Sequence, residues 1–127
     1  MAAHARVILI EDDDGLRQAL DRLLTAAGFR TAAYASAEAL LADPALEEGV
    51  CVLSDLKLPG LSGLDLLSDW RARGGCPPLI LITAYDTPGL REEAMRRGAA
   101  AYLAKPFRGT ELLEVLNAVI ERSARSP

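Results

Sequence analysis

Cysteine is scarce in this chain of 127 residues, which contains two, Cys51 and Cys76. A disulfide framework or a structural zinc site needs several cysteines or histidines at short, recurring spacings. Cys51 lies in an apolar segment and Cys76 lies beside two prolines, and neither belongs to a metal-ligand spacing. We therefore predict reduced thiols, with no disulfide framework and no zinc site.

Long hydrophobic runs are also missing, although hydrophobic residues make up 50% of the chain. A membrane-spanning helix needs roughly 20 consecutive apolar residues, and every apolar run here is much shorter. The opening residues MAAHA lack the charged and apolar regions of an export signal. These absences predict a cytoplasmic protein with no membrane partner.

Basic charge is limited too. The chain has 14 lysines and arginines against 18 aspartates and glutamates, for a formal net charge of −4. Proteins that bind nucleic acid directly usually concentrate lysine and arginine in a dense stripe. Because no such stripe is present, we expect no direct binding to nucleic acid.

The residues that are present alternate between two patterns. Five short apolar runs predict β-strands, at residues 6–10, 30–34, 50–54, 79–83 and 100–103. Apolar residues at helical spacing follow each run and predict helices, at 16–27, 36–43, 64–73, 89–97 and 112–120. This alternation implies right-handed crossovers and a parallel sheet with helices on both faces. We predict a single α/β domain over residues 1–127, a doubly wound (βα)5 fold with a five-stranded parallel sheet and a core at about 6–122.

Several chemically active residues come directly at the ends of these strands, where ligands of such sheets bind. They are Glu11 and Asp12 after the first strand, Asp55 after the third, Thr83 at the end of the fourth, and Lys105 after the fifth. Three carboxylates at one rim would repel each other unless a cation lay among them. Mg²⁺ accepts such oxygen ligands, so Glu11, Asp12 and Asp55 predict a magnesium site. The neighbouring Asp13 or Asp14 is more simply read as an N-cap of the first helix.

Four motifs carry a family resemblance: VILIEDD, VLSDLKLPGLSG, LITAY and YLAKPF, in that order. Together they resemble the receiver domain of two-component response regulators, which has the CheY-like fold, over Arg6 to about Arg122. The phrases YASAEALL and LPGLSGLDLL are most similar to the FixJ branch. One departure is Glu11, where many receivers carry aspartate, but one more methylene group should still reach the metal.

The resemblance implies a role in phosphoryl transfer for the residues at these strand ends. Asp55 would be the phosphoacceptor, taking a phosphoryl group from a phosphohistidine of a partner kinase to form an aspartyl phosphate. The backbone carbonyl of Lys57 would bind Mg²⁺ together with the three carboxylates. Lys105 would contact a phosphoryl oxygen as a point charge, and its peptide bond to Pro106 would be cis. The domain would catalyse only its own phosphorylation and dephosphorylation, so we do not expect a conventional enzyme.

The resemblance also implies a switch. Thr83 would donate its hydroxyl to the phosphoryl group, and Tyr102 would turn inward as Thr83 moves. The face made by the fourth helix, fifth strand and fifth helix would then change, and a downstream domain, a partner or a second copy in a homodimer would bind it. His4 is the only histidine, so the phosphoryl donor would be a separate histidine kinase or phosphotransfer protein.

Three alternatives stay open from the residues alone. The run from Asp12 to Gly15 superficially matches the DxDG motif of haloacid-dehalogenase-like phosphatases, which would make Asp12 the nucleophile. A flavodoxin-like or nucleotide-binding protein shares the sheet, but it needs a glycine-rich or hydroxyl-rich phosphate loop in place of EDDD. A receiver used purely for interaction would not need the complete set of acceptor, metal ligands, hydroxyl and lysine.

Overall fold

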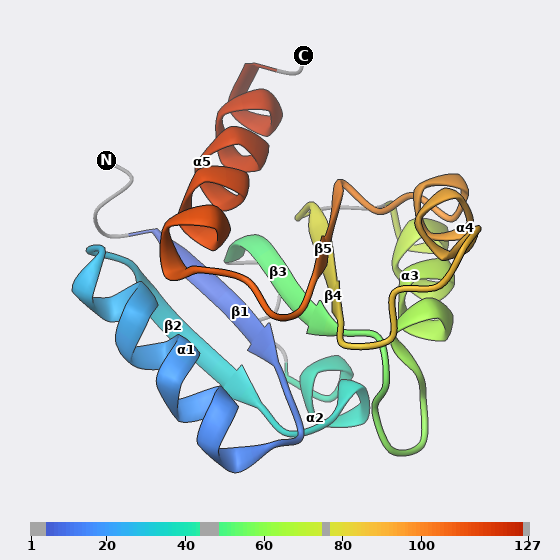
Figure 1. Ribbon diagram of the computed structural model, residues 1–127, viewed down its shortest axis with the longest axis horizontal. Coiled ribbons are helices and arrows are strands. Elements are labelled where there is room, and N and C mark those ends of the chain that lie inside the picture. The colour runs from blue at the N-terminus through green and yellow to red at the C-terminus, as the bar shows by residue number, and fades with distance from the viewer. Residues whose placement is uncertain (1–4, 44–48, 75–76, 126–127) are drawn as a thin grey trace.

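The computed structural model of this protein describes residues 5–43, 49–74 and 77–125, in which strands and helices alternate strictly (Figure 1). The strands are β1 (Arg6–Ile10), β2 (Arg30–Tyr34), β3 (Gly49–Asp55), β4 (Leu79–Thr83) and β5 (Ala101–Ala104). The helices are α1 (Asp14–Ala26), α2 (Ala37–Leu41), α3 (Gly63–Ala72), α4 (Leu90–Arg96) and α5 (Gly109–Arg125). None of the helices in these ranges is long and apolar enough to cross a membrane.

The five strands form one parallel sheet in the order β2-β1-β3-β4-β5. The chain moves outward from β1 to β2, then returns past β1 to β3 and continues in the other direction. The strand order therefore reverses between β1 and β3, and ligands of open α/β sheets bind beyond the strand ends at such a point. This topology confirms the predicted five-stranded (βα)5 fold.

Helices cover both faces of the sheet, and each face has its own apolar core (Figure 1). On one face, residues of α1 and α5 such as Leu24 and Leu116 pack on Leu9 and Leu53 of the central strands. The core on the other face contains residues of α2, α3 and α4, including Trp70, which is 3% exposed. The central strands β1, β3 and β4 are mostly buried, which explains their continuous apolar runs.

The helix starts follow local capping chemistry. Asp13, Ser36 and Ser62 each accept a hydrogen bond from a backbone amide three residues later, at the start of α1, α2 and α3. α4 differs, because Gly89 at its N-cap position provides no side-chain hydrogen bond and has a φ of +84°. Among α1 to α4, α4 is therefore the helix whose start lacks a side-chain cap.

Most of the predicted boundaries agree with the structure within a residue or two. β3 is longer than predicted by one residue at each end, so Asp55 is the last residue of the strand, and β5 begins and ends one residue later. Cys51 is a buried free thiol. The predictions on Cys76 and His4 lie outside the described residues.

Candidate functional site

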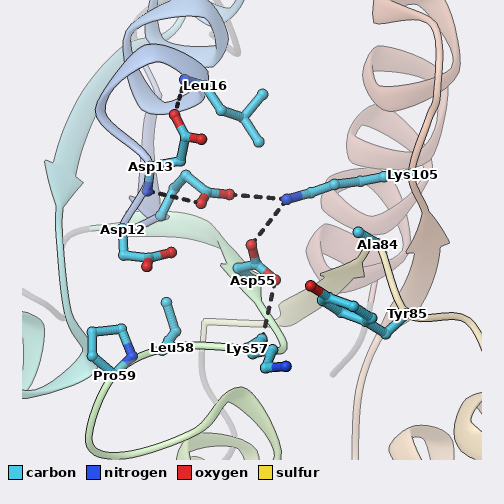
Figure 2. Close-up of a pocket in the computed structure, with 11 residues that line it drawn as sticks. Asp12, Asp13, Leu16, Asp55, Lys57, Leu58, Pro59, Ala84, Tyr85 and Lys105 are labelled. Carbon is cyan, nitrogen blue, oxygen red and sulfur yellow. Dashed lines mark hydrogen bonds and ion pairs between the residues drawn. The ribbon is translucent and has the colours of Figure 1, made fainter.

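A pocket of about 490 Å³ lies at the carboxyl edge of the sheet, where the strand order reverses (Figure 2). Its walls come from the loops that follow β1, β3, β4 and β5. The lining residues are Glu11, Asp12, Asp13, Leu16, Asp55, Lys57, Leu58, Pro59, Ala84, Tyr85 and Lys105. The structure thus brings together the three predicted acids and the predicted lysine from separate parts of the chain.

Asp55 is held at the floor of this pocket by contacts to both of its carboxylate oxygens. Oδ1 accepts a hydrogen bond from the backbone amide of Lys57 at 3.1 Å, and Oδ2 lies 2.9 Å from Nζ of Lys105 (Figure 2). The side chain is largely buried, since Asp55 is 8% exposed. A carboxylate fixed in this way presents its oxygens in one defined orientation at the open edge of the sheet.

Lys105 joins the acids of β1 and β3. Its Nζ also lies 3.2 Å from Oε1 of Glu11, so one ammonium bridges two buried carboxylates. Burial works to lower the pKa of Lys105, but the hydrogen bonds and charges of Asp55 and Glu11 outweigh it and raise the pKa above its usual value. Lys105 therefore stays charged at neutral pH. Its peptide bond to Pro106 is cis, as the resemblance implied.

Glu11 has the most perturbed carboxyl group of the site. It is 3% exposed, and its Oε2 accepts a hydrogen bond from the Asp13 amide at 3.1 Å. Burial raises the pKa of this carboxyl to about 7; the amide of Asp13 works against this rise, and the nearby charge of Asp55 adds to it. Such a value means that negative charge on Glu11 is costly even with the Lys105 ammonium nearby.

The three predicted ligands meet the basic requirement of a cation site. Glu11, Asp12 and Asp55 each offer a carboxylate oxygen, and these oxygens lie within 4.8 Å of one another. The ammonium of Lys105 offsets one negative charge, which leaves excess negative charge in a small volume. Carboxylate oxygens in this arrangement suit a hard divalent cation such as Mg²⁺, so the donor set fits the metal that the sequence predicted.

Thr83 and Tyr102, the predicted switch residues, are buried and do not contribute to the pocket lining. Thr83 is fully buried at the end of β4, and its hydroxyl oxygen accepts a hydrogen bond from the Tyr85 amide at 2.9 Å. Tyr102 on β5 is 5% exposed and donates its hydroxyl to Oδ1 of Asp86 at 2.9 Å. Burial and this bond raise the pKa of Tyr102 to about 12, so the phenol is neutral at physiological pH.

Several residues around the site were not singled out by sequence reasoning. Arg17 of α1 donates to the backbone carbonyl of Glu11 at 2.8 Å and pairs with Asp14, so it braces the acidic loop. The spacing of Asp14 and Arg17, three residues apart on a helix, was a usable signal for this pair. By contrast, Asp86 and Arg91, which lies 4.8 Å from the centre of the Tyr102 ring, gave no local signal, because their contacts span different elements.

Comparison with known proteins agrees with this geometry. Residues 7–117 match the response regulator receiver domain family, and the chain belongs to that family. It is a receiver domain of a two-component system, a class of signalling domain. This membership favours the receiver interpretation over the phosphatase and flavodoxin-like alternatives that the residues alone left open.

Two relatives illustrate the likeness. The response regulator protein FleR of Pseudomonas aeruginosa is 44% identical over 112 residues, which cover 88% of this chain and 24% of FleR. The transcriptional regulatory protein FixJ of Azorhizobium caulinodans is 39% identical over 119 residues, which cover 93% of this chain and 56% of FixJ. The chain therefore spans less than two thirds of the length of these relatives.

Solved structures show the same fold. The crystal structure of FixJ-N superposes with a TM-score of 0.82 at 32% identity and covers 92% of this chain and 94% of that one. A CheY-like receiver domain from Methanospirillum hungatei gives a TM-score of 0.87 at 24% identity over 96% of this chain and 98% of that one. The FixJ matches confirm the predicted likeness to that branch.

Proposed function

We propose that Asp55 is the phosphoacceptor of this receiver domain. The observation that carries the proposal is the position of its carboxylate, which lies at the carboxyl edge of the sheet between the Lys57 amide and the Lys105 ammonium. In the reaction, a carboxylate oxygen of Asp55 attacks the phosphorus of a phosphohistidine on a partner. The P–O bond forms as the P–N bond breaks, and the imidazole nitrogen keeps the electron pair and takes up a proton.

Lys105 has a defined part in this chemistry. Its ammonium already contacts Asp55 at 2.9 Å, so it is placed to neutralise a phosphoryl oxygen once that group is attached. The carboxyl groups of Asp55 and Glu11 together raise the pKa of Lys105 and fix the direction of its ammonium. Both contacts exist before any phosphoryl group arrives, which lowers the cost of reorganising the site during transfer.

The metal proposed for the site is Mg²⁺, held by Glu11, Asp12, Asp55 and the backbone carbonyl of Lys57. Bound Mg²⁺ would neutralise charge that develops on the transferring phosphoryl group. The chain's own contribution is the cluster of three carboxylate oxygens within 4.8 Å.

The output is a change of the face formed by α4, β5 and α5. We propose that Thr83 responds to the phosphoryl group at Asp55, that Tyr102 follows, and that a downstream domain or a second copy of the chain binds the altered face. The donor is a histidine kinase or phosphotransfer protein, and the whole cycle belongs in the cytoplasm. Residues 1–127 act as one receiver domain that speeds its own phosphorylation and dephosphorylation.

Replacing the acceptor tests this function. Acetyl phosphate with Mg²⁺ should add about 80 daltons to the parent chain, the mass expected for one phosphoryl group on a carboxylate. Asp55→Asn should gain nothing in the same intact-mass measurement, because its amide is not a competent nucleophile. Asp65→Asn is the matched control, since Asp65 is exposed at the start of α3, and it should gain the same mass as the parent. Equal labelling of Asp55→Asn would refute the proposal.

A further inference from the structure

The loop between β3 and α3 carries one side of the site. It covers residues 56–62 and includes three of the residues that line the pocket. A hydrogen bond joins the two ends of the loop, because the Gly63 amide donates to the Leu56 carbonyl at 2.7 Å. The Lys57 amide binds the carboxylate of Asp55 at 3.1 Å. The backbone beside the phosphoacceptor is therefore part of this loop, and its position depends on what holds the loop.

Glu38, in the first turn of α2, holds the tip of the loop. Its Oε2 accepts a hydrogen bond from the Leu61 amide at 3.0 Å, across 23 residues of sequence. Gly60 lies against the same carboxylate: a Cβ built there would lie 2.6 Å from Oε2, and its φ of +73° favours glycine. On the inner side, Leu58 is 8% exposed and belongs to the same apolar cluster as two buried residues of α2. The loop is thus attached to α2 by one polar and one apolar contact.

We infer that Glu38 is a positioning residue for the metal site, although it is not among the pocket-lining residues. Fixing the Leu61 amide limits the conformations of the loop that contains Lys57, whose backbone carbonyl is the proposed ligand. Without this hydrogen bond the loop samples more conformations, and binding of the metal has to order it. The inference rests on the proposed function, because it concerns the Mg²⁺ site assigned there.

A set of variants at position 38 separates hydrogen bonding from charge. Glu38→Met removes the acceptor at similar length, and we expect Mg²⁺ affinity to fall about fivefold, which corresponds to about 1 kcal/mol. Glu38→Gln keeps a neutral acceptor for the Leu61 amide, so a loss of about twofold is expected. The matched control is Glu114→Gln, an exposed acid on α5, which should bind Mg²⁺ as the parent does. Calorimetric titration with Mg²⁺ gives these affinities.

Amide hydrogen exchange of the metal-free protein gives an independent measurement. In Glu38→Met the Leu61 amide should exchange about fivefold faster, whereas the amide of Leu81 in the buried strand β4 should exchange as in the parent. Faster exchange with unchanged Mg²⁺ affinity would make Glu38 a structural contact only and overturn the inference. Unchanged exchange in Glu38→Met would overturn it as well.

One further variant distinguishes failure of the inference from failure of the metal site. Asp12→Asn removes a proposed ligand, so it should weaken Mg²⁺ binding more than any substitution of Glu38. If Asp12→Asn weakens binding and Glu38→Met does not, the inference alone is wrong. If Asp12→Asn binds Mg²⁺ as tightly as the parent, the proposed metal site is wrong and the inference falls with it.

Discussion

At the scale of single residues, the site depends on charges that balance across strands. Lys105 contacts Asp55 and Glu11 at 2.9 and 3.2 Å, so it offsets the repulsion between two largely buried acids. Thr83 has a different position, because its hydroxyl is buried and already bonded to the Tyr85 amide. The proposed function gives chemistry to Asp55, charge to Lys105 and signalling to Thr83, and substitutions should separate the three roles.

Thr83→Ala is expected to preserve phosphorylation and lose the switch. The hydroxyl adds one neutral hydrogen bond, worth about 1 kcal/mol, so the rate with acetyl phosphate should stay within about tenfold of the parent. Without the hydroxyl, the end of β4 has no direct contact to the phosphoryl group, and Tyr102 should keep one position in both states. Intact mass measures the first effect, and the Tyr102 ring signals in NMR spectra measure the second.

Lys105→Ala serves as the comparison for this prediction. It should still be phosphorylated, because the nucleophile remains. Phosphorylation should change the Tyr102 signals only weakly, because the charge that holds the phosphoryl oxygens is gone. A Thr83→Ala protein whose Tyr102 signals still change on phosphorylation would contradict the switching role of the hydroxyl.

At the scale of elements, α4 has fewer stabilising contacts than α1. α1 has a side-chain cap from Asp13 and buries Leu20 and Leu24. α4 has seven residues, no side-chain cap at Gly89, and only Ala94 fully buried within the helix. Few buried contacts and an uncapped start give low local stability. The sequence of α4, LREEAMR, contains correspondingly few apolar residues.

A phosphoryl mimic should therefore act at a distance. Asp86 lies in the loop between Thr83 and α4 and accepts the Tyr102 hydroxyl, while Arg91 of α4 lies over the Tyr102 ring. A shift of Thr83 would be transmitted through these contacts to α4 and β5. Beryllofluoride with Mg²⁺ should change amide NMR shifts throughout residues 90–105 as well as near Asp55. Changes confined to the pocket would contradict an output through α4, and Asp55→Asn should show none.

Local patterns predicted the elements well because each is set by its own residues. β1, β2 and β4 were predicted at their observed bounds, because each is a short run of mostly apolar residues. The cap of α2 by Ser36 also follows from the local sequence, because the acceptor Ser36 and the donor Ala39 are three residues apart. The hydrogen bond from the Leu61 amide to Glu38 could not be predicted from the sequence, because it joins residues that only the folded sheet brings together. The same holds for the bond between Tyr102 and Asp86.

At the scale of the whole molecule, the rim could be predicted because a parallel sheet collects its strand ends at one edge. The orientation of its side chains could not, since it depends on burial and on pairing between distant strands. Burial also affects Cys51, which lies in β3 beneath α1 and α5. Burial raises the pKa of this thiol to about 12, against a smaller lowering by its contact to the Val52 carbonyl.

This perturbed thiol predicts how stability changes in alkaline solution. Because the folded pKa is about 12 and the ordinary value is 9.0, the neutral thiol favours folding fully below pH 9, and this stability is lost as pH rises from 9 to 12. The loss is on the order of 4 kcal/mol, from about 1.4 kcal/mol per pH unit. The free energy of unfolding, measured with urea, should fall less steeply over this pH interval for Cys51→Ala than for the parent. Equal slopes for the two proteins would contradict the burial account.

The central claim, that phosphoryl transfer occurs at Asp55, is tested most directly by mapping the label on the parent chain. After reaction with acetyl phosphate and Mg²⁺, borohydride reduction converts an aspartyl phosphate to homoserine, which peptide mass spectrometry locates. Transfer to Asp55 predicts homoserine at position 55, in the tryptic peptide of residues 31–57. Homoserine at position 12, with Asp55 unchanged, would contradict the account and favour a nucleophile after β1.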